Sequence, residues 1–282
     1  MELQLITWNV HFRDADADAL DALKPRADAL DVVLLQEVKN SAREAYRARL
    51  ASLGFGYFEH GGGDGPMKRY GNVTATKRPI TRIPTTVQAP FPQLLVHVRL
   101  EVAPAHTLEL INVHAPNGSN NGWDKIRTLR GARRIVEDMR PAPVVVAGDF
   151  NEPRYLPGGL PVRSFAWRKD TAESDWQRLK DQPWQRKNAR GDVEAEPRGA
   201  WDDAVGWYFT EDSGLQHAHW ATHGRGTAHV SHRTSADEGG ERWFDHLFVS
   251  KALRVRESAY LDELCAPLGP SDHSALWAKV EV

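Results

Sequence analysis

The sequence has one cysteine, no long hydrophobic run and almost no net charge, and each of these scarcities excludes a class of protein. A single thiol, Cys265, cannot form a disulfide within the chain, so we expect a fold that needs no oxidising compartment. No apolar run approaches the roughly 18 residues of a membrane span, and the first residues lack the basic start and long apolar stretch of a signal peptide. We therefore expect a cytoplasmic protein without a membrane partner.

The charge balance and composition indicate an ordinary folded enzyme-sized chain. The 36 Lys and Arg nearly cancel the 38 Asp and Glu, which excludes a protein that coats polyanions through net charge alone. The 282 residues are 41% hydrophobic and include 10 Trp, enough for a sizeable core. We predict a single domain over residues 1–282, with an irregular connector rich in Trp and Arg at about 152–240.

Short apolar segments that end in polar residues recur along the chain and predict a sheet-rich fold. A Ser41-x-x-Glu44 capping box and a closing Gly54 predict a helix over 41–53. Apolar residues at spacings of three and four predict a second helix over 122–140, whose basic face, with Lys125, is expected to be solvated. Within the connector only 200–208 looks ordered. Strands are expected at 3–7, 31–35, 71–76, 94–102, 108–113, 144–147, 242–250 and 274–280.

Polar side chains stand at or near the ends of these strands. They are Asn9, Glu37, His114, Asp149, Asn151, Asp245, Asp272 and His273. When strands of one layered core end in acids, amides and imidazoles, a single rim can gather them into one site. Oxygen ligands such as Glu37 and Asp272 suit Mg²⁺ or Mn²⁺, and histidines suit proton transfer. This set of groups indicates phosphate ester hydrolysis.

Seven motifs follow one another in an order that resembles the endonuclease/exonuclease/phosphatase superfamily, over residues 7–273. They are Thr7-Trp8-Asn9, Leu35-Gln36-Glu37, Gly71-Asn72, Asn112-Val113-His114, Gly148-Asp149-Phe150-Asn151, Asp245-His246-Leu247-Phe248-Val249-Ser250 and Ser271-Asp272-His273. Each motif alone is weak evidence, and the specificity lies in their order. The resemblance implies an α/β (α+β) fold: a four-layered sandwich of two mostly antiparallel β-sheets packed face to face, with helices outside and one metal-dependent site at the sheet edges.

The resemblance also implies a role for each motif residue. Glu37 would be the principal ligand of Mg²⁺, with Mn²⁺ as the alternative ion, helped by Asn9 and Asp272. Asp245 would orient His273, which either activates the attacking water or binds the phosphoryl oxygens as a cation. Asp149, with Asn151 beside it, is the other candidate for the base. His114 would protonate the leaving group. Abasic-site endonucleases carry Tyr at this position, whereas deoxyribonuclease- and sphingomyelinase-like members carry His.

The substrate stays open among phosphate esters, and a phosphodiester of nucleic acid or a nucleotide is expected first. Asn72 and Asn117 are candidate substrate contacts. In the connector, bases interleave with aromatics, so Trp167 and Arg168 are candidate stacking residues, the alternative being Trp side chains that tie the connector to the core. A phosphatase or phosphodiesterase acting on a small phosphorylated molecule or lipid headgroup is the second hypothesis, and a non-catalytic binding module on the same fold is the third.

The remaining histidines match none of these motifs. His11 is expected to be structural, and those between His217 and His232 match no zinc signature. The sequence implies no protein partner.

Overall fold

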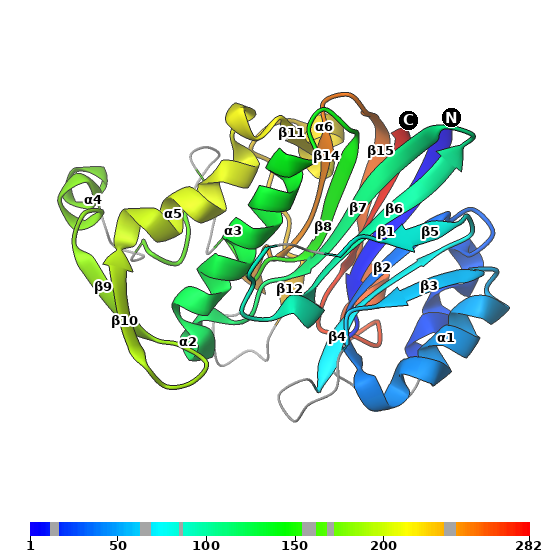
Figure 1. Ribbon diagram of the computed structural model, residues 1–282, viewed down its shortest axis with the longest axis horizontal. Helices are drawn as coiled ribbons and strands as arrows, with labels where there is room; N and C mark the ends of the chain where they lie inside the picture. The colour runs from blue at the N-terminus through cyan, green and yellow to red at the C-terminus, as the bar shows by residue number, and fades with distance from the viewer. Residues whose placement is uncertain (12–16, 63–68, 85–86, 154–161, 168–171, 234–240) are drawn as a thin grey trace.

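Two six-stranded sheets form the centre of the protein (Figure 1). The computed structural model describes residues 1–11, 17–62, 69–84, 87–153, 162–167, 172–233 and 241–282. The first sheet has the order β15-β16-β1-β2-β4-β3, and the second has the order β11-β14-β8-β7-β6-β5. Neighbouring strands are antiparallel except for the parallel pairs β1–β2 and β7–β8. Both sheets are therefore mixed and mostly antiparallel, as predicted.

The strands of each sheet match most of the predicted segments to within a few residues. In the first sheet they are β1 (Glu2–Asn9), β2 (Val32–Lys39), β3 (Tyr57–His60), β4 (Tyr70–Thr76), β15 (Arg254–Leu261) and β16 (Ala275–Glu281). In the second they are β5 (Ile80–Arg82), β6 (Leu95–Ala103), β7 (His106–His114), β8 (Val144–Asp149), β11 (Leu215–His217) and β14 (Asp245–Ser250). The edge strand β15 was not predicted from the sequence.

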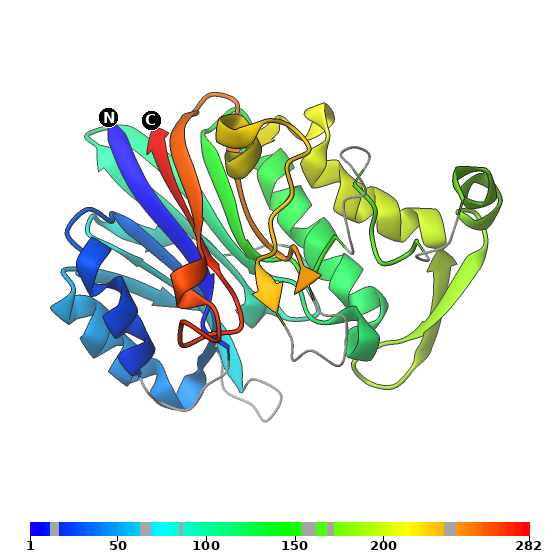
Figure 2. The same cartoon turned by 180° about the vertical axis from the view of Figure 1, so that it is seen from behind.

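Helices cover the outer face of each sheet and complete four layers (Figure 2). The 3-10 helix η1 (Ala17–Arg26) and α1 (Arg43–Ser52) pack on the first sheet through buried residues such as Leu20 and Leu50. On the second sheet, α3 (Trp123–Asp138) and α5 (Arg198–Gly206) pack through residues such as Leu129 and Trp201. The predicted four-layered sandwich is confirmed. In the described part of the chain, no helix has the length and apolarity to cross a membrane.

The apolar core between the sheets ends in a polar layer, and strand parity explains why. Leu3 and Leu5 of β1 lie in the core between the sheets, whereas Ile6 and Trp8 face the outer helices. Because side chains alternate along a strand, Asn9 continues the inner row. The same parity brings further polar side chains inward at the ends of β7, β8 and β14. They are His114, Asp149 and Asp245.

Buried amides join the two sheets just above that polar end. Gln36 Nε2 donates to Thr7 Oγ1 at 3.1 Å and to Asn112 Oδ1 of the opposite sheet at 2.8 Å. Asn112 Nδ2 donates back to the carbonyls of Leu35 and Val73 at 3.1 and 2.8 Å. These paired polar groups fix the register between the sheets at the depth where the strand-end residues meet.

Two local predictions about helices need correction. The expected helix at 41–53 begins later, because residues 40–42 form the 3-10 turn η2 and α1 starts at Arg43. Its N-cap is Ala42, without a side-chain cap, so the Ser41–Glu44 capping box does not form. The predicted C-terminal glycine holds, since Gly54 follows the helix with φ +91°.

The connector holds much more regular structure than the one ordered segment predicted. It contains α4 (Glu173–Leu179), the ribbon of β9 (Pro183–Lys187) and β10 (Val193–Pro197), α5, β11, α6 (Ala218–His223) and β12 (His232–Arg233), which pairs with β13 (Glu241–Arg242). Its buried Trp176, Trp201 and Trp207 belong to the core beneath α3. Figure 1 shows α4 and the β9–β10 ribbon extending from the body of the sandwich.

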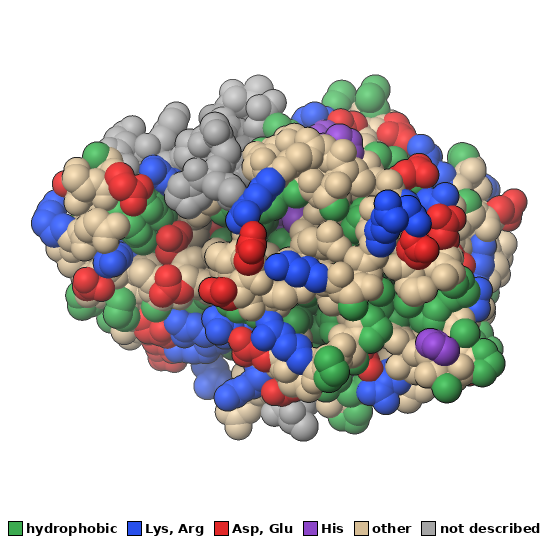
Figure 3. Space-filling view, turned by 90° about the horizontal axis from the view of Figure 1, so that it is seen from above, with side chains coloured by type: hydrophobic (Ala, Val, Ile, Leu, Met, Phe, Trp, Pro, Cys, Tyr) green, Lys and Arg blue, Asp and Glu red, His purple; other side chains and the backbone are tan. Residues whose placement is uncertain are grey.

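The chain termini lie together at the end of the sandwich away from the polar layer. Met1 donates its amino group to the Val282 carbonyl at 3.0 Å, because β1 and β16 pair over nearly their whole length. On the face seen in Figure 3, the side chains drawn in colour mix basic with acidic groups. That mixture accords with the near-zero net charge of the chain.

Candidate active site

The carboxylate of Asp149 is the point at which both sheets meet. Asn9 Nδ2, from the first sheet, donates to Asp149 Oδ2 at 2.9 Å. His114 Nε2 and His273 Nε2 lie 3.7 and 3.9 Å from the same oxygen. Three residues, which lie up to 264 positions apart in the sequence, thus surround one buried oxygen atom. The convergence that we predicted from strand ends is present for this group.

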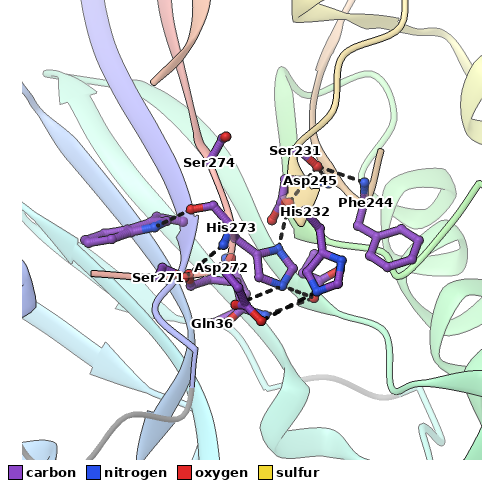
Figure 4. Close-up of polar contacts among 12 residues, drawn as sticks. Gln36, Ser231, His232, Phe244, Asp245, Ser271, Asp272, His273 and Ser274 are labelled. Carbon is purple, nitrogen blue, oxygen red and sulfur yellow. Dashed lines mark hydrogen bonds and ion pairs between the residues drawn. The ribbon is translucent and has the colours of Figure 1, made fainter. Parts of the chain in front are cut away.

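His273 is held by Asp245 in a buried pair (Figure 4). His273 Nδ1 lies 2.8 Å from Asp245 Oδ2, which also accepts a hydrogen bond from Ser231 Oγ at 2.8 Å. Burial alone would lower the pKa of His273, but Asp245, Asp149 and Asp272 outweigh it and raise that pKa to about 10. This raised pKa favours the imidazolium form, and the ring is oriented so that Nε2 faces Asp149.

The loop after β8 holds both oxygens of Asp149. The backbone N–H of Asn151 donates to Asp149 Oδ1 at 2.7 Å, and Asn151 Nδ2 donates to Asp149 Oδ2 at 3.2 Å and to the Ala115 carbonyl at 2.9 Å. Asn151 has φ +50°, a conformation that costs free energy for a residue with a side chain and that clusters at functional sites. Burial raises the pKa of Asp149, and His273 and His114 offset part of that rise.

Glu37 brings a second carboxylate to the same place. A bulge in the β2–β4 pairing between Leu35 and Val38 puts Glu37 at φ +60°, and its Oε1 lies 3.6 Å from His114 Nε2. Ligand atoms of Glu37, His114 and Asp149 lie within 4.8 Å of one another. Carboxylate oxygens are the donors that a hard divalent cation prefers, and Glu37 offers them beside the buried Asp149, so the residues present fit the metal that the motifs imply.

Asp272 falls in a neighbouring group of possible ligands, with His232 and His273. His11 Nδ1 lies 2.7 Å from Asp272 Oδ1, and His232 Nε2 lies 3.6 Å from Oδ2. Burial acts to raise the pKa of Asp272, but hydrogen bonds with His11 and His232 outweigh it and lower that pKa below its usual range. His11, which we expected to be structural, thus pairs with a residue of the candidate site. Its φ of +53° follows an Asx turn in which Asn9 Oδ1 accepts the His11 N–H at 2.9 Å.

The two amides predicted to contact substrate, Asn72 and Asn117, make hydrogen bonds within the protein. Asn72 is fully buried and donates to the carbonyls of Leu94 and Asn112 at 2.9 and 3.0 Å, which is a structural role. Asn117 is exposed and caps the short helix α2 (Gly118–Asn121), accepting the Ser119 N–H at 2.8 Å. A role for either side chain in binding substrate remains a prediction.

Trp167 is not the exposed stacking surface that we predicted. It is 2% exposed, its ring stacks on Trp176 with centroids 4.3 Å apart, and the Arg163 guanidinium lies 3.9 Å from its centroid. The alternative, Trp side chains that tie the connector to the core, is the one that holds here. Arg168 lies outside the described residues.

Several residues at the site were missed by sequence reasoning. His232 and Ser231 reach it because β12 forms bridges beside His273, and no local pattern marks them. Tyr70, whose ring centroid lies 5.7 Å from that of His114, directly precedes the Gly71-Asn72 motif, and this adjacency was an available signal. His11, two residues beyond Asn9, was a second one.

Comparison with known proteins decides the family. A model of the endonuclease/exonuclease/phosphatase family matches residues 6–273. The chain belongs to that family. Its members are divalent-metal-dependent phosphoesterases, so the resemblance drawn from the seven motifs is confirmed. A search of curated proteins found no match to the sequence.

Solved structures of similar fold cover nearly the whole chain at low identity. A humanized D. rerio TDP2 is 15% identical with a TM-score of 0.61, covering 100% of this chain and 99% of its own. ANGEL2, a 2′,3′-cyclic phosphatase in complex with adenosine-2′,3′-vanadate, is 18% identical with a TM-score of 0.65, covering 99% and 95%. The 3′ phosphatase NExo from Neisseria, bound to product DNA hairpin, is 15% identical with a TM-score of 0.65, covering 99% and 100%. At these identities the likeness shows the fold.

Proposed function

We propose that this protein is a Mg²⁺-dependent phosphodiesterase that acts on nucleic acid or nucleotides. The observation that carries the proposal is the arrangement around Asp149 Oδ2, where Asn9 donates at 2.9 Å and the imidazoles of His114 and His273 face the same oxygen. A buried carboxylate between two imidazoles and beside a second carboxylate is equipped to handle a proton and a phosphoryl group together. Membership of a phosphoesterase family supports it.

Asp149 is the proposed general base. Its carboxylate is held through both oxygens by Asn151, it faces the reacting centre, and burial raises its pKa toward that of a useful proton acceptor. His273 is the proposed anchor for the phosphoryl oxygens, because the pair with Asp245 keeps it cationic. His114, whose Nε2 lies between Glu37 and Asp149, is the proposed acid for the leaving oxygen.

The proposed metal ligands are Glu37, Asn9 and Asp272. A divalent cation held there would stabilise negative charge on the phosphoryl oxygens as a Lewis acid. The protein's own groups complete that stabilisation, since the His273 imidazolium and the Asn151 amide lie beside Asp149 Oδ2. In-line attack by water then needs no covalent intermediate with the chain.

A hollow lined by Tyr70, whose ring centroid lies 5.7 Å from that of His114, supports a nucleotide as part of the substrate. It has a volume of about 350 Å³ and is lined by Tyr70, Phe91 and Pro116 together with the polar side chains of Arg69, Asn120 and Asn121. Aromatic faces with amide edges can bind a base, and a guanidinium can bind phosphate. A larger hollow of about 500 Å³ continues past Phe91.

The larger hollow has two arginines in its lining, Arg127 and Arg190. Arg127 is already paired with Asp124 and Glu194, each at 2.8 Å, whereas Arg190 is exposed. We therefore place one nucleoside next to the reacting phosphate, and Arg190 is the cation that a longer substrate would reach.

The test is a panel of substrates incubated with Mg²⁺, with Mn²⁺ and with EDTA. The panel holds single- and double-stranded DNA, RNA, a dinucleotide, bis(nitrophenyl) phosphate, inositol phosphates and sphingomyelin. Because two structural relatives are named as phosphatases, it also holds a DNA 3′-phosphate and an adenosine 2′,3′-cyclic phosphate. We expect cleavage of diesters that EDTA abolishes. Release of phosphate from monoesters alone, or hydrolysis of sphingomyelin alone, would replace the proposal with the second hypothesis, and no turnover of any member would favour a binding module.

A further inference from the structure

A lysine is completely buried against the back of the catalytic loop. Lys125, in the first turn of α3, is 1% exposed, and so is Glu152. Lys125 Nζ donates to the Asn151 carbonyl at 2.5 Å and to Glu152 Oε1 at 3.1 Å. The expectation that Lys125 belongs to a solvated basic face is wrong, because its position on α3 points it at the loop rather than at water.

The carboxylate and the carbonyl of Glu152 have partners from different elements. Trp201 Nε1, from α5, donates to Glu152 Oε1 at 2.7 Å, and the Phe165 N–H donates to Oε2 at 3.0 Å. The Glu152 carbonyl lies 2.8 Å from His246 Nε2 of β14. The loop that carries Asp149 and Asn151 is thus fastened from α3, α5, β14 and the segment around Phe165.

Stability alone gives little reason to keep a buried Lys–Glu pair. The desolvation of the two charged groups offsets most of their attraction, and well-packed apolar residues of similar volume serve as well or better. Asn151, in contrast, needs support, because its φ of +50° is costly and persists only where the surroundings impose it. The short hydrogen bond from Lys125 falls on the carbonyl of that strained residue.

We propose that Lys125 and Glu152 are positioning residues for catalysis, which rests on the function proposed above. Lys125 fixes the Asn151 peptide, Asn151 fixes both oxygens of Asp149, and Glu152 fixes Lys125 while tying it to Trp201 of the connector. Neither residue reaches the substrate. Their loss should therefore lower kcat and leave KM unchanged, because the carboxylate would lose its alignment with the reacting phosphate.

The primary test variant is Lys125→Met/Glu152→Gln, which removes both charges and leaves no unpaired ion in the interior. We expect a urea midpoint close to that of the wild type and a KM for bis(nitrophenyl) phosphate within about twofold of the wild-type value. We expect kcat to be lower by about 10- to 100-fold, because a catalytic group displaced by roughly 1 Å loses about that much rate. Lys125→Arg, which keeps a donor for the Asn151 carbonyl, should recover part of kcat. Arg133→Met, which breaks an exposed 2.9 Å pair with Glu137 on the same helix, is the matched control.

The outcomes separate a positioning role from a structural one. A double variant with wild-type kcat would overturn the proposal. The proposal would also be overturned if kcat and the urea midpoint both fell in the double variant and both recovered in Lys125→Arg, because the role would then be structural. Backbone amide resonances of Asp149 and Asn151 give a readout without turnover: they should move in the double variant and stay in place in Arg133→Met. If the wild-type protein hydrolyses no diester, the proposed function fails while the amide shifts still report whether Lys125 orders the loop.

Discussion

Replacing Gly148 by alanine should damage the fold and the site together. A Cβ atom at position 148 would lie 1.8 Å from the Val113 carbonyl oxygen and 2.8 Å from its carbon, which belong to the neighbouring strand β7. The backbone has φ +144°, a region that residues with side chains rarely adopt. We expect the backbone strain to lower the free energy of unfolding by about 1–3 kcal/mol, and the overlap to lower it by about a further 1–3 kcal/mol. Together these losses are a large share of the stability of a typical domain.

The functional consequence follows from the register of the two strands. Val113 pairs with Gly148 and His114 with Asp149, so any widening of β7–β8 moves the proposed acid away from the proposed base. A displacement near 1 Å costs about 100-fold in rate. Urea unfolding and diester hydrolysis per folded molecule measure the two effects. Gly206→Ala is the control, because no atom lies within 4 Å of its added Cβ and we expect an unchanged or slightly raised stability. A Gly148→Ala protein with wild-type midpoint and rate would refute this reasoning.

Three further predictions concern pH, the connector and the metal. Burial lowers the pKa of His246 to about 4. As the pH falls below about 6.5, this histidine binds a proton in the unfolded chain before it does so in the folded protein, so the free energy of unfolding decreases until the pH reaches about 4. Between pH 7.5 and 5.5 this histidine lowers the free energy of unfolding by about 1 kcal/mol. The decrease in stability against urea over that range should therefore be smaller in His246→Gln. Trp167→Ala should lower the free energy of unfolding by about 3–5 kcal/mol without changing KM for oligonucleotides, because the side chain is buried. A raised KM at unchanged stability would instead support the role of Trp167 in stacking on substrate. Glu37→Gln should weaken Mg²⁺ binding, measured by calorimetry, by at least about tenfold while the fold persists.

Much of the site could be predicted because it obeys strand periodicity. Asn9, Asp149 and Asp245 each lie an even number of residues from the inward-facing apolar side chains of their strands, as Asn9 does from Leu5. The alternation that identifies the inward-facing row therefore also identifies the polar residue at its end. The motifs add Glu37 and His273, which parity alone does not supply, since one sits in a bulge and the other in a loop before β16.

What could not be predicted depends on contacts between segments far apart in sequence. His11 reaches Asp272 from the turn after β1 and His232 reaches it from β12, and nothing in their local sequence indicates this. Lys125 was misjudged because charge usually marks a solvated face, and only the tertiary partner Glu152 reveals why it is buried. The Trp and Arg pattern of the connector fits a stacking surface and a packed core equally well, and burial decides between them.

Comparing diester hydrolysis by the wild-type protein and Asp149→Asn, in Mg²⁺ and at matched urea stability, tests the account most directly. The amide keeps the size of the side chain and one acceptor for Asn151, but it cannot take a proton. We predict that the wild type cleaves the diester and that the rate falls by about 100- to 10,000-fold in the variant, as expected when a general base is lost. A variant that retains the wild-type rate would contradict the assignment of the reaction to the buried carboxylate where the two sheets meet.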